Sequence, residues 1–328
     1  MEKPLLEVQG LRTYFFSNHG TVRAADGVSF SVSAGETLGI VGESGCGKSV
    51  TSLSILNLIE PPGKIVGGKI LFKGENIAQA DGDRMRAIRG NEISMIFQEP
   101  MTSLNPVFRI REQIGEVLML HRHMDKKEAW QAATALLGEV GIPRPEEVSR
   151  CYPHELSGGM RQRVMIAMAL ACSPELLIAD EPTTALDVTI QAQILSLMNR
   201  LKQKTNTAIL LITHDLGVVA QMADHVIVMY AGKVVESAPT EELFEKPLHP
   251  YTQGLLASIP NAAQEGKKLY TIPGTVPSPA DLPQGCYFAP RCPHAKEHCR
   301  KAQPALAKSG AKRAVRCYLY SQEEEANE

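Results

Sequence analysis

The chain has 328 residues, of which 44% are hydrophobic, and a formal net charge of -2 at pH 7. This length exceeds that of most single hydrophobic cores, so two or more packed units are expected. The balanced charge lacks the basic excess of a nucleic-acid-binding protein, so we expect no nucleic-acid partner.

The first third of the chain predicts strands followed by one helix. Residues 5–16 and 28–36 alternate loosely between apolar and polar side chains, as in antiparallel strands with one solvated face. Residues 37–42 form a short apolar run typical of a buried strand. After a glycine-rich turn, residues 48–59 carry apolar side chains at helical spacing, and the sequence PPG at 61–63 ends this helix.

The middle of the chain alternates between helical and strand patterns. Residues 92–98 predict a strand, and the pattern is then mostly helical to residue 172. Further buried-type strands are predicted at 176–182, 207–215 and 225–230, with helical stretches between them. Apolar strands that alternate with helices indicate a parallel sheet covered on both faces.

The composition changes near residue 239. Eleven of the 21 prolines lie between Pro239 and Pro304. We expect an appended module of loops and short helices, with too little apolar periodicity to build a core unaided. A small unit of this kind commonly needs a staple such as a metal.

The sequence gives no sign of membrane insertion or export. Its longest uninterrupted apolar run, VMIAMALAC, is far shorter than the ~20 residues of a membrane-spanning helix. The N-terminal residues show no basic segment followed by an apolar one, so no secretory signal is expected. The thiols should therefore meet a reducing compartment, where clustered cysteines favour metal binding over disulfides.

The sequence GESGCGKS, Gly42–Ser49, matches the phosphate-binding pattern G-x-x-x-x-G-K-[ST]. It follows a predicted buried strand and opens a predicted helix, as the mechanism requires. Glycines let backbone N–H groups wrap a phosphate, and the helix N-terminus adds partial positive charge. Lys48 is expected to reach the terminal phosphates, and Ser49 to offer its hydroxyl to Mg²⁺.

Two further stretches carry polar groups suited to a nucleotide. The apolar strand at 176–180 ends in Asp180, which can hold Mg²⁺ through water, beside Glu181, which can orient or deprotonate an attacking water. Residues 155–163 place Ser157 as a helix cap before two glycines, a second anion site. Since one nucleotide needs only one such turn, the second suggests use in trans.

Together these motifs resemble the ATP-binding subunits of ABC transporters. They run in family order as Walker A, a Q-loop at Gln98, a signature at 156–160, Walker B at 176–180, a D-loop at 185–187 and a switch histidine at His214. The resemblance covers roughly residues 5–235. It implies an α/β fold, a P-loop ABC ATPase core with a mixed parallel sheet, a small antiparallel sheet, a helical subdomain and a cysteine-containing C-terminal module.

The resemblance also implies domain boundaries. Residues 1–98 and 173–238 would form the ATPase core, residues 99–172 the helical subdomain with the signature, and residues 239–328 the C-terminal extension. Two such chains would meet head to tail, with each ATP between the P-loop of one and the signature turn of the other.

Residue roles follow from the resemblance. Glu181, His214 and Gln98 would be catalytic, and Ser49 and Gln98 would hold Mg²⁺. His214 would contact the γ-phosphate, although a histidine that caps a helix after a strand fits the sequence equally well. The nucleotide contacts would be Phe15, Gly42, Ser44, Gly45, Cys46, Gly47, Lys48, Ser49, Val50, Asp180, Ser157, Gly158, Gly159 and Asp187.

Three positions need comment. Phe15 best fits the spacing of the aromatic that stacks on adenine, with Tyr14 and Phe16 as neighbours that can take the role. The signature ends in Met160 where Gln is usual. Cys46 replaces a more common Ser, and its place at a helix N-terminus near Lys48 predicts a lowered thiol pKa and easy alkylation.

Longer stretches, such as HPYTQGLLASIP and PRCPHAKEHC, resemble the oligopeptide and dipeptide importers. The resemblance implies a second, homologous ATPase subunit, two membrane permease subunits and, indirectly, a peptide-binding receptor protein, with this chain peripheral at the cytoplasmic face of the inner membrane. A soluble ABC protein of DNA repair or translation would usually show two cassettes, a coiled-coil insertion or basic tracts. A non-hydrolysing partner subunit would be expected to lack Glu181 or His214.

Four cysteines follow Gly285 with the spacing C-x5-C-x6-C-x17-C. This is not the tight C-x2-C of zinc ribbons, and four thiolates suit Zn²⁺ or an iron–sulfur cluster equally by count. The resemblance implies a [4Fe-4S] cluster, with Zn²⁺ as the alternative and His294 and His298 as spare ligands. The ligands would be Cys286, Cys292, Cys299 and Cys317.

Overall fold

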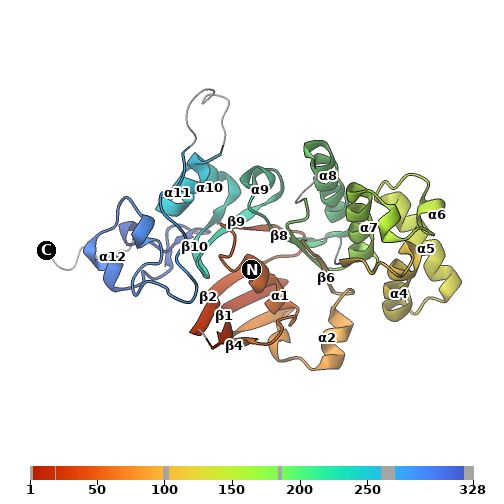
Figure 1. Cartoon of the computed structure of the whole chain (residues 1–328), viewed down its shortest axis with the longest axis horizontal. Helices are drawn as coiled ribbons and strands as arrows, with labels where there is room; N and C mark the ends of the chain where they lie inside the picture. Colours follow the sequence, from red (N-terminus) through yellow and green to blue (C-terminus); the bar gives the residue numbers. More distant parts are fainter. Residues whose placement is uncertain (1–2, 19, 99–102, 184–186, 260–269, 321–328) are drawn as a thin grey trace. The chain divides into compact units, whose positions relative to one another are not determined.

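The structure is a computed structural model that describes residues 3–18, 20–98, 103–183, 187–259 and 270–320. Figure 1 shows the chain coloured along its sequence, and its internal contacts divide it into two compact units. The first unit comprises residues 1–5, 32–37 and 79–212, and the second comprises residues 6–31, 38–78 and 213–328. Within the described ranges, no helix is long and apolar enough to cross a membrane.

The first unit contains three parallel strands in the order β6-β7-β8. They span Ile93–Ile96, Leu176–Asp180 and Ala208–Ile212. Every residue of β7 and β8 is buried, which explains their continuous apolar sequences. The helix α8, Val188–Thr205, lies between these two strands in the chain, as in a parallel crossover.

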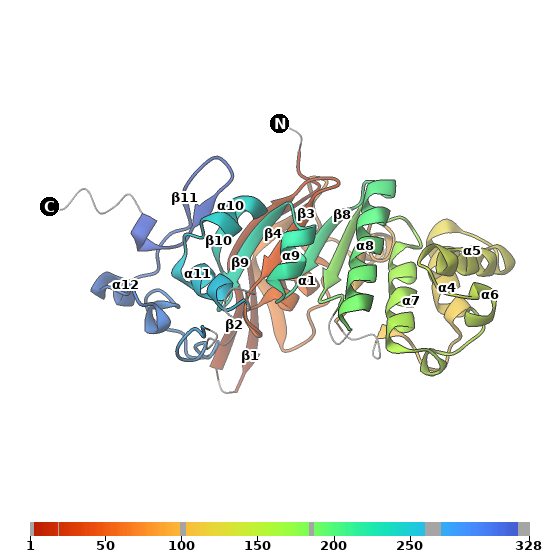
Figure 2. The same ribbon diagram turned by 90° about the horizontal axis from the view of Figure 1, so that it is seen from above.

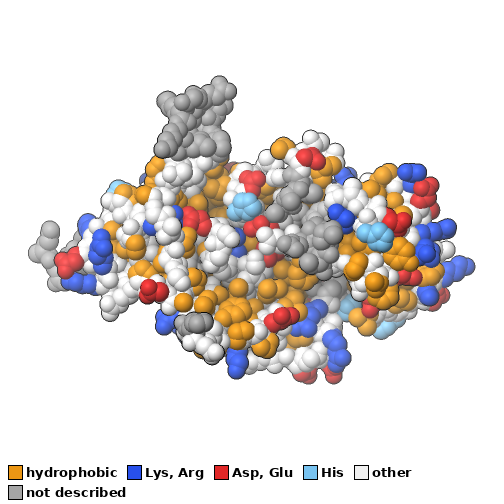
Figure 3. Space-filling view, viewed as in Figure 1, with side chains coloured by type: hydrophobic (Ala, Val, Ile, Leu, Met, Phe, Trp, Pro, Cys, Tyr) orange, Lys and Arg blue, Asp and Glu red, His pale blue; other side chains and the backbone are white. Residues whose placement is uncertain are grey.

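The rest of the first unit is helical. Its helices are α2 (Gly82–Ile88), α4 (Ile110–Arg122), α5 (Lys126–Glu139), α6 (Pro145–Val148) and α7 (Gly158–Leu170). A capping box of Asp125 and Glu128 starts α5. Gly115 lets α4 approach Trp130 of α5, where a β-carbon would lie 3.3 Å from the indole ring. Acidic and basic side chains are interspersed over these helices, as on a solvated face (Figure 3).

The second unit begins with a small sheet in the order β2-β1-β4-β5. The strands are β1 (Leu6–Ser17), β2 (Gly20–Val32), β4 (Gly63–Phe72) and β5 (Glu75–Asn76). β1 pairs antiparallel with β4, and the register shifts between Gln9 and Arg12. This bulge changes the phase of the strand, so that Leu11 and Thr13 are buried as Leu6 and Val8 are.

A second run of strands in this unit has the order β3-β9-β10-β12-β11. β3 and β9 are parallel, and the later pairs are antiparallel. Their bounds are Thr37–Val41, His225–Tyr230, Lys233–Pro239, Ala314–Val315 and Ala307–Lys308. The proline-rich C-terminal segment therefore adds two short strands to the sheet of the preceding residues.

The helices of the second unit are short. They are α1 (Lys48–Ile55), α9 (Leu216–Met222), α10 (Thr240–Glu245), α11 (Pro250–Ala257) and α12 (Glu297–Lys301). α9, α10 and α11 lie along one side of β9 and β10 (Figure 2). Single 3-10 turns occur in this unit at Ala289–Arg291 and Tyr318–Tyr320, in the first unit at Pro153–Glu155, and at the boundary of the two at Ile77–Gln79.

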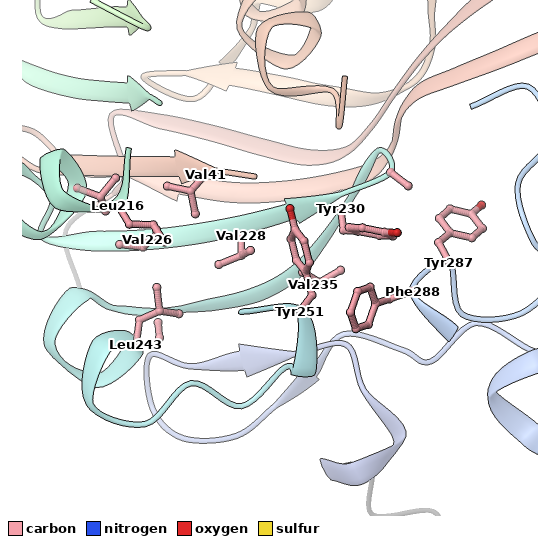
Figure 4. Packing of buried hydrophobic residues seen from close by; sticks show 13 residues of the cluster. Val41, Leu216, Val226, Val228, Tyr230, Val235, Leu243, Tyr251, Tyr287 and Phe288 are labelled. Atoms are coloured by element: carbon pink, nitrogen blue, oxygen red, sulfur yellow. The ribbon is translucent and has the colours of Figure 1, made fainter. Parts of the chain in front are cut away.

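One hydrophobic core joins the strands of the second unit to the C-terminal segment (Figure 4). Val41, Val226 and Val228 of β3 and β9 pack with Tyr251 of α11 and with Phe288. The segment after residue 239 thus buries Tyr251, Tyr287 and Phe288 against the sheet instead of building a separate core. The predicted fold class, with its mixed parallel sheet, small antiparallel sheet and helices, is confirmed.

Candidate nucleotide site

The loop Gly42–Ser49 connects β3 to α1 in a conformation that only glycine tolerates. Gly47, the residue before α1, has φ of 100°, and a β-carbon there would collide with the carbonyl oxygen of Ala24. A β-carbon at Gly42 would collide with the carbonyl oxygen of Met229. The pattern glycines are therefore required by close backbone contacts as well as by the turn.

Lys48 lies over this loop. Its Nζ donates to the carbonyl oxygens of Gly42 at 2.8 Å and Glu43 at 3.1 Å, and the residue is buried. Ser44 and Gly45 at the tip of the loop are exposed, and Ser49 and Val50 are half-buried. The loop thus combines accessible backbone, a helix N-terminus and a fixed ammonium group, which suits the binding of an anion.

The prediction for Cys46 is wrong. Its side chain is buried, and burial raises the pKa of the thiol even though Lys48 acts to lower it. A β-carbon on Gly42 would lie 2.7 Å from the sulfur, which shows how closely the loop wraps it. Desolvation of the thiolate therefore outweighs the nearby ammonium and the helix N-terminus, so the thiol pKa is raised and not lowered.

The sequence patterns did not point to Glu43, whose partners lie far along the chain. Its backbone N–H donates to Tyr251 Oη at 2.9 Å. Its carboxylate accepts from Arg291 Nη1 at 2.9 Å and Nη2 at 3.2 Å. Because Arg291 is 248 positions away, no local pattern carries a signal for this contact.

His214 lies close in the chain to a residue that pairs with β3, the strand from which the P-loop starts. The backbone N–H of Thr213 donates to the carbonyl oxygen of Ile40 in β3 at 3.2 Å. His214 follows and is exposed. Asp215, and not the histidine, caps α9 by accepting from the backbone N–H groups of Gly217 and Val218, so the capping interpretation does not apply to His214.

In the first unit, the structure brings Gln98 and Glu181 together. Gln98 Nε2 donates to Glu181 Oε2 at 3.0 Å, although 83 positions separate the two residues. Glu181 follows the buried Asp180 at the end of β7, and its φ of 47° is unusual for a non-glycine residue. Its backbone N–H donates to Ile212 at the end of β8, which fixes this conformation. An amide and two carboxylates at one sheet edge can hold a cation or orient water.

The predicted signature turn forms the start of α7. Ser157 Oγ accepts from the backbone N–H of Met160 at 3.4 Å, and Ser157 and Gly158 are exposed. Gly159 packs against Ile190, where a β-carbon would lie 3.2 Å from a side-chain methyl group. The turn therefore presents an uncovered helix N-terminus to solvent.

The D-loop is described only in part. Asp187 is exposed and caps α8 by accepting from Ile190 N at 2.9 Å. Residues 185–186 lie outside the described part of the chain, as does residue 99 at the start of the predicted helical subdomain.

The three N-terminal aromatics have different surroundings. Phe15 lies against Gly63, where a β-carbon would sit 2.6 Å from its ring. Tyr14 Oη donates to Asp26 Oδ1 at 2.8 Å, which fixes this ring in a structural hydrogen bond. Phe16 is exposed. The adenine contact of Phe15 stays a prediction.

The four C-terminal cysteines line a single cavity. Cys286, Cys292, Cys299 and Cys317 face it together with His249, His294 and His298. In the described part of the chain, no three His, Cys, Asp or Glu side chains are grouped as ligands of one metal ion.

The pKa shifts of these thiols also indicate that the four cysteines lie close together. Burial raises the pKa of Cys286 and Cys292, and it raises that of Cys317 to about 11. Charge on the other cysteines of the group adds to the rise at Cys317. Burial therefore disfavours the thiolate form of these three cysteines.

Comparison with known families places these features in context. The family model for ABC transporters matches residues 25–184, and the model for the oligopeptide/dipeptide transporter C-terminal region matches residues 235–299. An oligopeptide transport ATP-binding protein, AppD of Bacillus subtilis, is 59% identical over 97% of this chain and 98% of its own length. The chain belongs to the ATP-binding subunits of oligopeptide and dipeptide ABC transporters.

Other relatives of this peptide-transporter ATPase agree. The dipeptide transport ATP-binding protein DppD of Bacillus subtilis is 51% identical over 99% of this chain and 97% of its own. The oligopeptide transport ATP-binding protein OppD of Salmonella typhimurium is 53% identical over 92% and 90%. The solved dimeric ATP-binding cassette MJ0796, bound to ADP and phosphate, superposes with a TM-score of 0.65 at 26% identity, covering 72% of this chain and 98% of that one.

Family membership fixes the general activity. The chain is an ABC-type ATPase with the cassette fold, and it binds ATP. ATPase subunits of this family dimerise and work with membrane permease subunits.

Proposed function

We propose that this ATPase hydrolyses ATP to power the import of peptides, oligopeptides or dipeptides, through a membrane ABC transporter. The observation that carries the proposal is the match of one chain to both the ABC model and the peptide-transporter C-terminal region. The names of its relatives, which are oligopeptide and dipeptide transport proteins, support the substrate class.

In this proposal each motif has one role. The loop Gly42–Ser49 and Val50 hold the phosphates, and Phe15 stacks on adenine. Glu181 handles the attacking water, and His214 contacts the γ-phosphate. The exposed turn of Ser157, Gly158 and Gly159, with Asp187, acts on the nucleotide of the partner chain.

By the chemistry of their oxygen atoms, three side chains are candidate ligands of Mg²⁺. The Ser49 hydroxyl, the Gln98 amide and the Asp180 carboxylate are hard oxygen ligands of the type that Mg²⁺ takes. The contact of Gln98 with Glu181 supports a shared role at this edge. When bound, Mg²⁺ would neutralise charge on the phosphates, and Glu181 would remain free of the metal to handle water.

The test uses the complete transporter in vesicles, with Glu181→Gln compared with wild type. Because Glu181 is the proposed base, we expect ATP binding to persist and ATPase activity and peptide uptake to fall about 100-fold or more. Glu147→Gln, an exposed glutamate on α6, is the control. Wild-type hydrolysis in Glu181→Gln would overturn the assignment of Glu181, and uptake of Ni²⁺ but no peptide would overturn the substrate class.

We further propose the composition of the transporter. This subunit would pair with a second, different ATPase subunit, contact two permease subunits, and act indirectly with a peptide-binding receptor at the other side of the membrane. Its place would be the cytoplasmic face of the inner membrane. The division into a core of 1–98 and 173–238, a helical subdomain of 99–172 and an extension of 239–328 also stays a prediction.

We propose that the four cysteines hold a [4Fe-4S] cluster, with Zn²⁺ as the alternative. The four thiols line one cavity, and charge on the other three adds to the raised pKa of Cys317, which supports a shared cation. Thiolates are the ligands of both groups. Bound there, either group would stabilise the folded extension, because the assembled site is absent from the unfolded chain.

Anaerobic purification tests the cluster. We expect brown protein with iron and labile sulfide, and we expect Cys292→Ser to lose the iron and open the extension to protease. Cys151→Ser, at a thiol outside the cavity, should keep both. If the protein is colourless and holds one zinc ion per chain, the site binds Zn²⁺ and the cluster assignment is wrong. If the protein is metal-free and its extension still resists protease, both assignments are wrong.

A further inference from the structure

Arg291 is held rigidly inside the extension. Its side chain is 6% exposed. Nε donates to the carbonyl oxygen of Pro273 at 3.0 Å, Nη2 to that of Ile272 at 3.4 Å, and Nη1 to Tyr230 Oη at 3.4 Å. An arginine fixed on several sides presents its remaining donors in one direction.

Those donors point at the P-loop. The two guanidinium nitrogens bind the two carboxylate oxygens of Glu43 in a bidentate pair. Tyr251 accepts from the backbone N–H of the same residue. Two side chains of the extension, Tyr251 of α11 and Arg291 of the turn before Cys292, therefore both bind Glu43 of the nucleotide loop. We call these two side chains the clamp.

The clamp packs against a cluster of aromatic rings (Figure 4). The ring of Tyr230 lies 4.7 Å from that of Tyr251 and 5.3 Å from that of Phe288, edge to face in both cases. Tyr251 and Phe288 are 5.5 Å apart. Since all three rings are buried, a shift of Arg291 would require repacking of this cluster.

Glu43 connects the clamp to the phosphate-binding lysine, Lys48. The carbonyl oxygen of Glu43 accepts from Lys48 Nζ at 3.1 Å. We propose that Arg291 is a positioning residue of the nucleotide site, which holds the P-loop through Glu43 and makes ATP affinity depend on the docked extension. This inference rests on the proposed role of the loop Gly42–Ser49.

The position of Arg291 in the chain places it next to the cysteine cavity. Arg291 directly precedes Cys292, whose backbone N–H donates to the carbonyl oxygen of Ala289 in the same turn at 3.4 Å. Cys292 also lines the cysteine cavity, so Arg291 connects the wall of this cavity to the P-loop.

The experiment measures binding of a fluorescent ATP analogue to the full-length chain, with thermal unfolding of each variant. Arg291→Met should weaken binding about five- to tenfold, at the low end of coupling between sites. Arg291→Lys keeps the charge but loses the fork, and should give a smaller loss. Arg313→Lys is the control for the loss of a buried arginine fork, because Arg313 is 8% exposed and pairs with buried Glu236 instead of a P-loop residue. The swapped pair Arg291→Glu with Glu43→Arg should recover part of the affinity.

The assembled transporter supplies a second readout. A positioning role predicts a higher KM for ATP in Arg291→Lys with kcat within about twofold of wild type, whereas loss of folded protein would lower the apparent kcat. Equal affinity for Arg291→Lys, Arg313→Lys and wild type, or no recovery in the swapped pair, overturns the inference. If Lys48→Ala binds ATP as wild type does, the nucleotide site itself is wrongly assigned, and the proposed function fails instead.

Discussion

At Cys46, two local effects compete. The helix N-terminus and Lys48 favour the thiolate, whereas burial disfavours it, and the pKa of the buried thiol is raised. The sequence shows the first effect, because it depends on neighbours in the chain. The second depends on how the loop folds over the sulfur, against Gly42. At this residue, desolvation therefore determines the direction of the pKa shift.

Alkylation rates test this result. Because a raised pKa leaves less thiolate at any pH below it, we expect N-ethylmaleimide to label native Cys46 slowly from pH 7 to about pH 9. Cys151, which is partly exposed, should react faster and serves as the internal control. Peptide mass mapping measures both, and equal rates should appear only in denaturant. Rapid labelling of Cys46 in the native chain would contradict its burial.

At the scale of an element, the start of α7 differs from that of most helices. Ser157 caps it, but Ser157 and Gly158 are exposed, a β-carbon on Gly158 would meet open space, and Gly159 packs against Ile190. An exposed helix N-terminus with bare backbone suits an anion from outside. This arrangement agrees with the expected action of the signature turn on the nucleotide of a partner chain.

Ser157→Arg tests action in trans. The bulky side chain should block the anion site and impair hydrolysis at the P-loop of the partner subunit, while this chain still binds ATP. Photo-crosslinking of nucleotide to each subunit separately measures the effect. Ser157→Ala, which loses only the cap at a cost of about 1 kcal/mol, separates blocking from helix destabilisation. Loss of labelling at this chain's own P-loop would contradict the head-to-tail arrangement.

For the whole molecule, the main result is that the extension shares the core of the second unit. Phe288 is 2% exposed and lies between Tyr230 and Tyr251, and β12 pairs with β10. Buried Glu236 also accepts from the extension, from the backbone N–H groups of Leu248 and His249 and from Arg313. Cooperative unfolding of these parts is therefore expected.

The substitution Phe288→Ala tests how much this shared core contributes to stability. The cavity should lower the free energy of unfolding by about 3–5 kcal/mol in urea titrations of the full chain. Leu319→Ala removes an exposed apolar side chain of the same extension and should change it by less than about 0.5 kcal/mol. A separate early transition of the extension, with the rest of the second unit unaffected, would show that the core is not shared.

The sequence by itself determined the features that depend on neighbours in the chain. The glycines of the P-loop, the helix after them and the apolar strands β7 and β8 follow from backbone sterics and periodicity, and the structure contains them all. Asp180 and Glu181 were found because a strand end places them. The function followed from a set of such local motifs in one order.

The tertiary structure alone decided which distant groups meet. The contact of Gln98 with Glu181 and the clamp of Arg291 on Glu43 join residues 83 and 248 positions apart. The family resemblance gave roles to the first pair, but no pattern pointed to the second. Burial of Cys46 likewise depends on packing. Local sequence fixes backbone conformation, whereas desolvation and long-range pairing depend on what the rest of the chain brings to the same place.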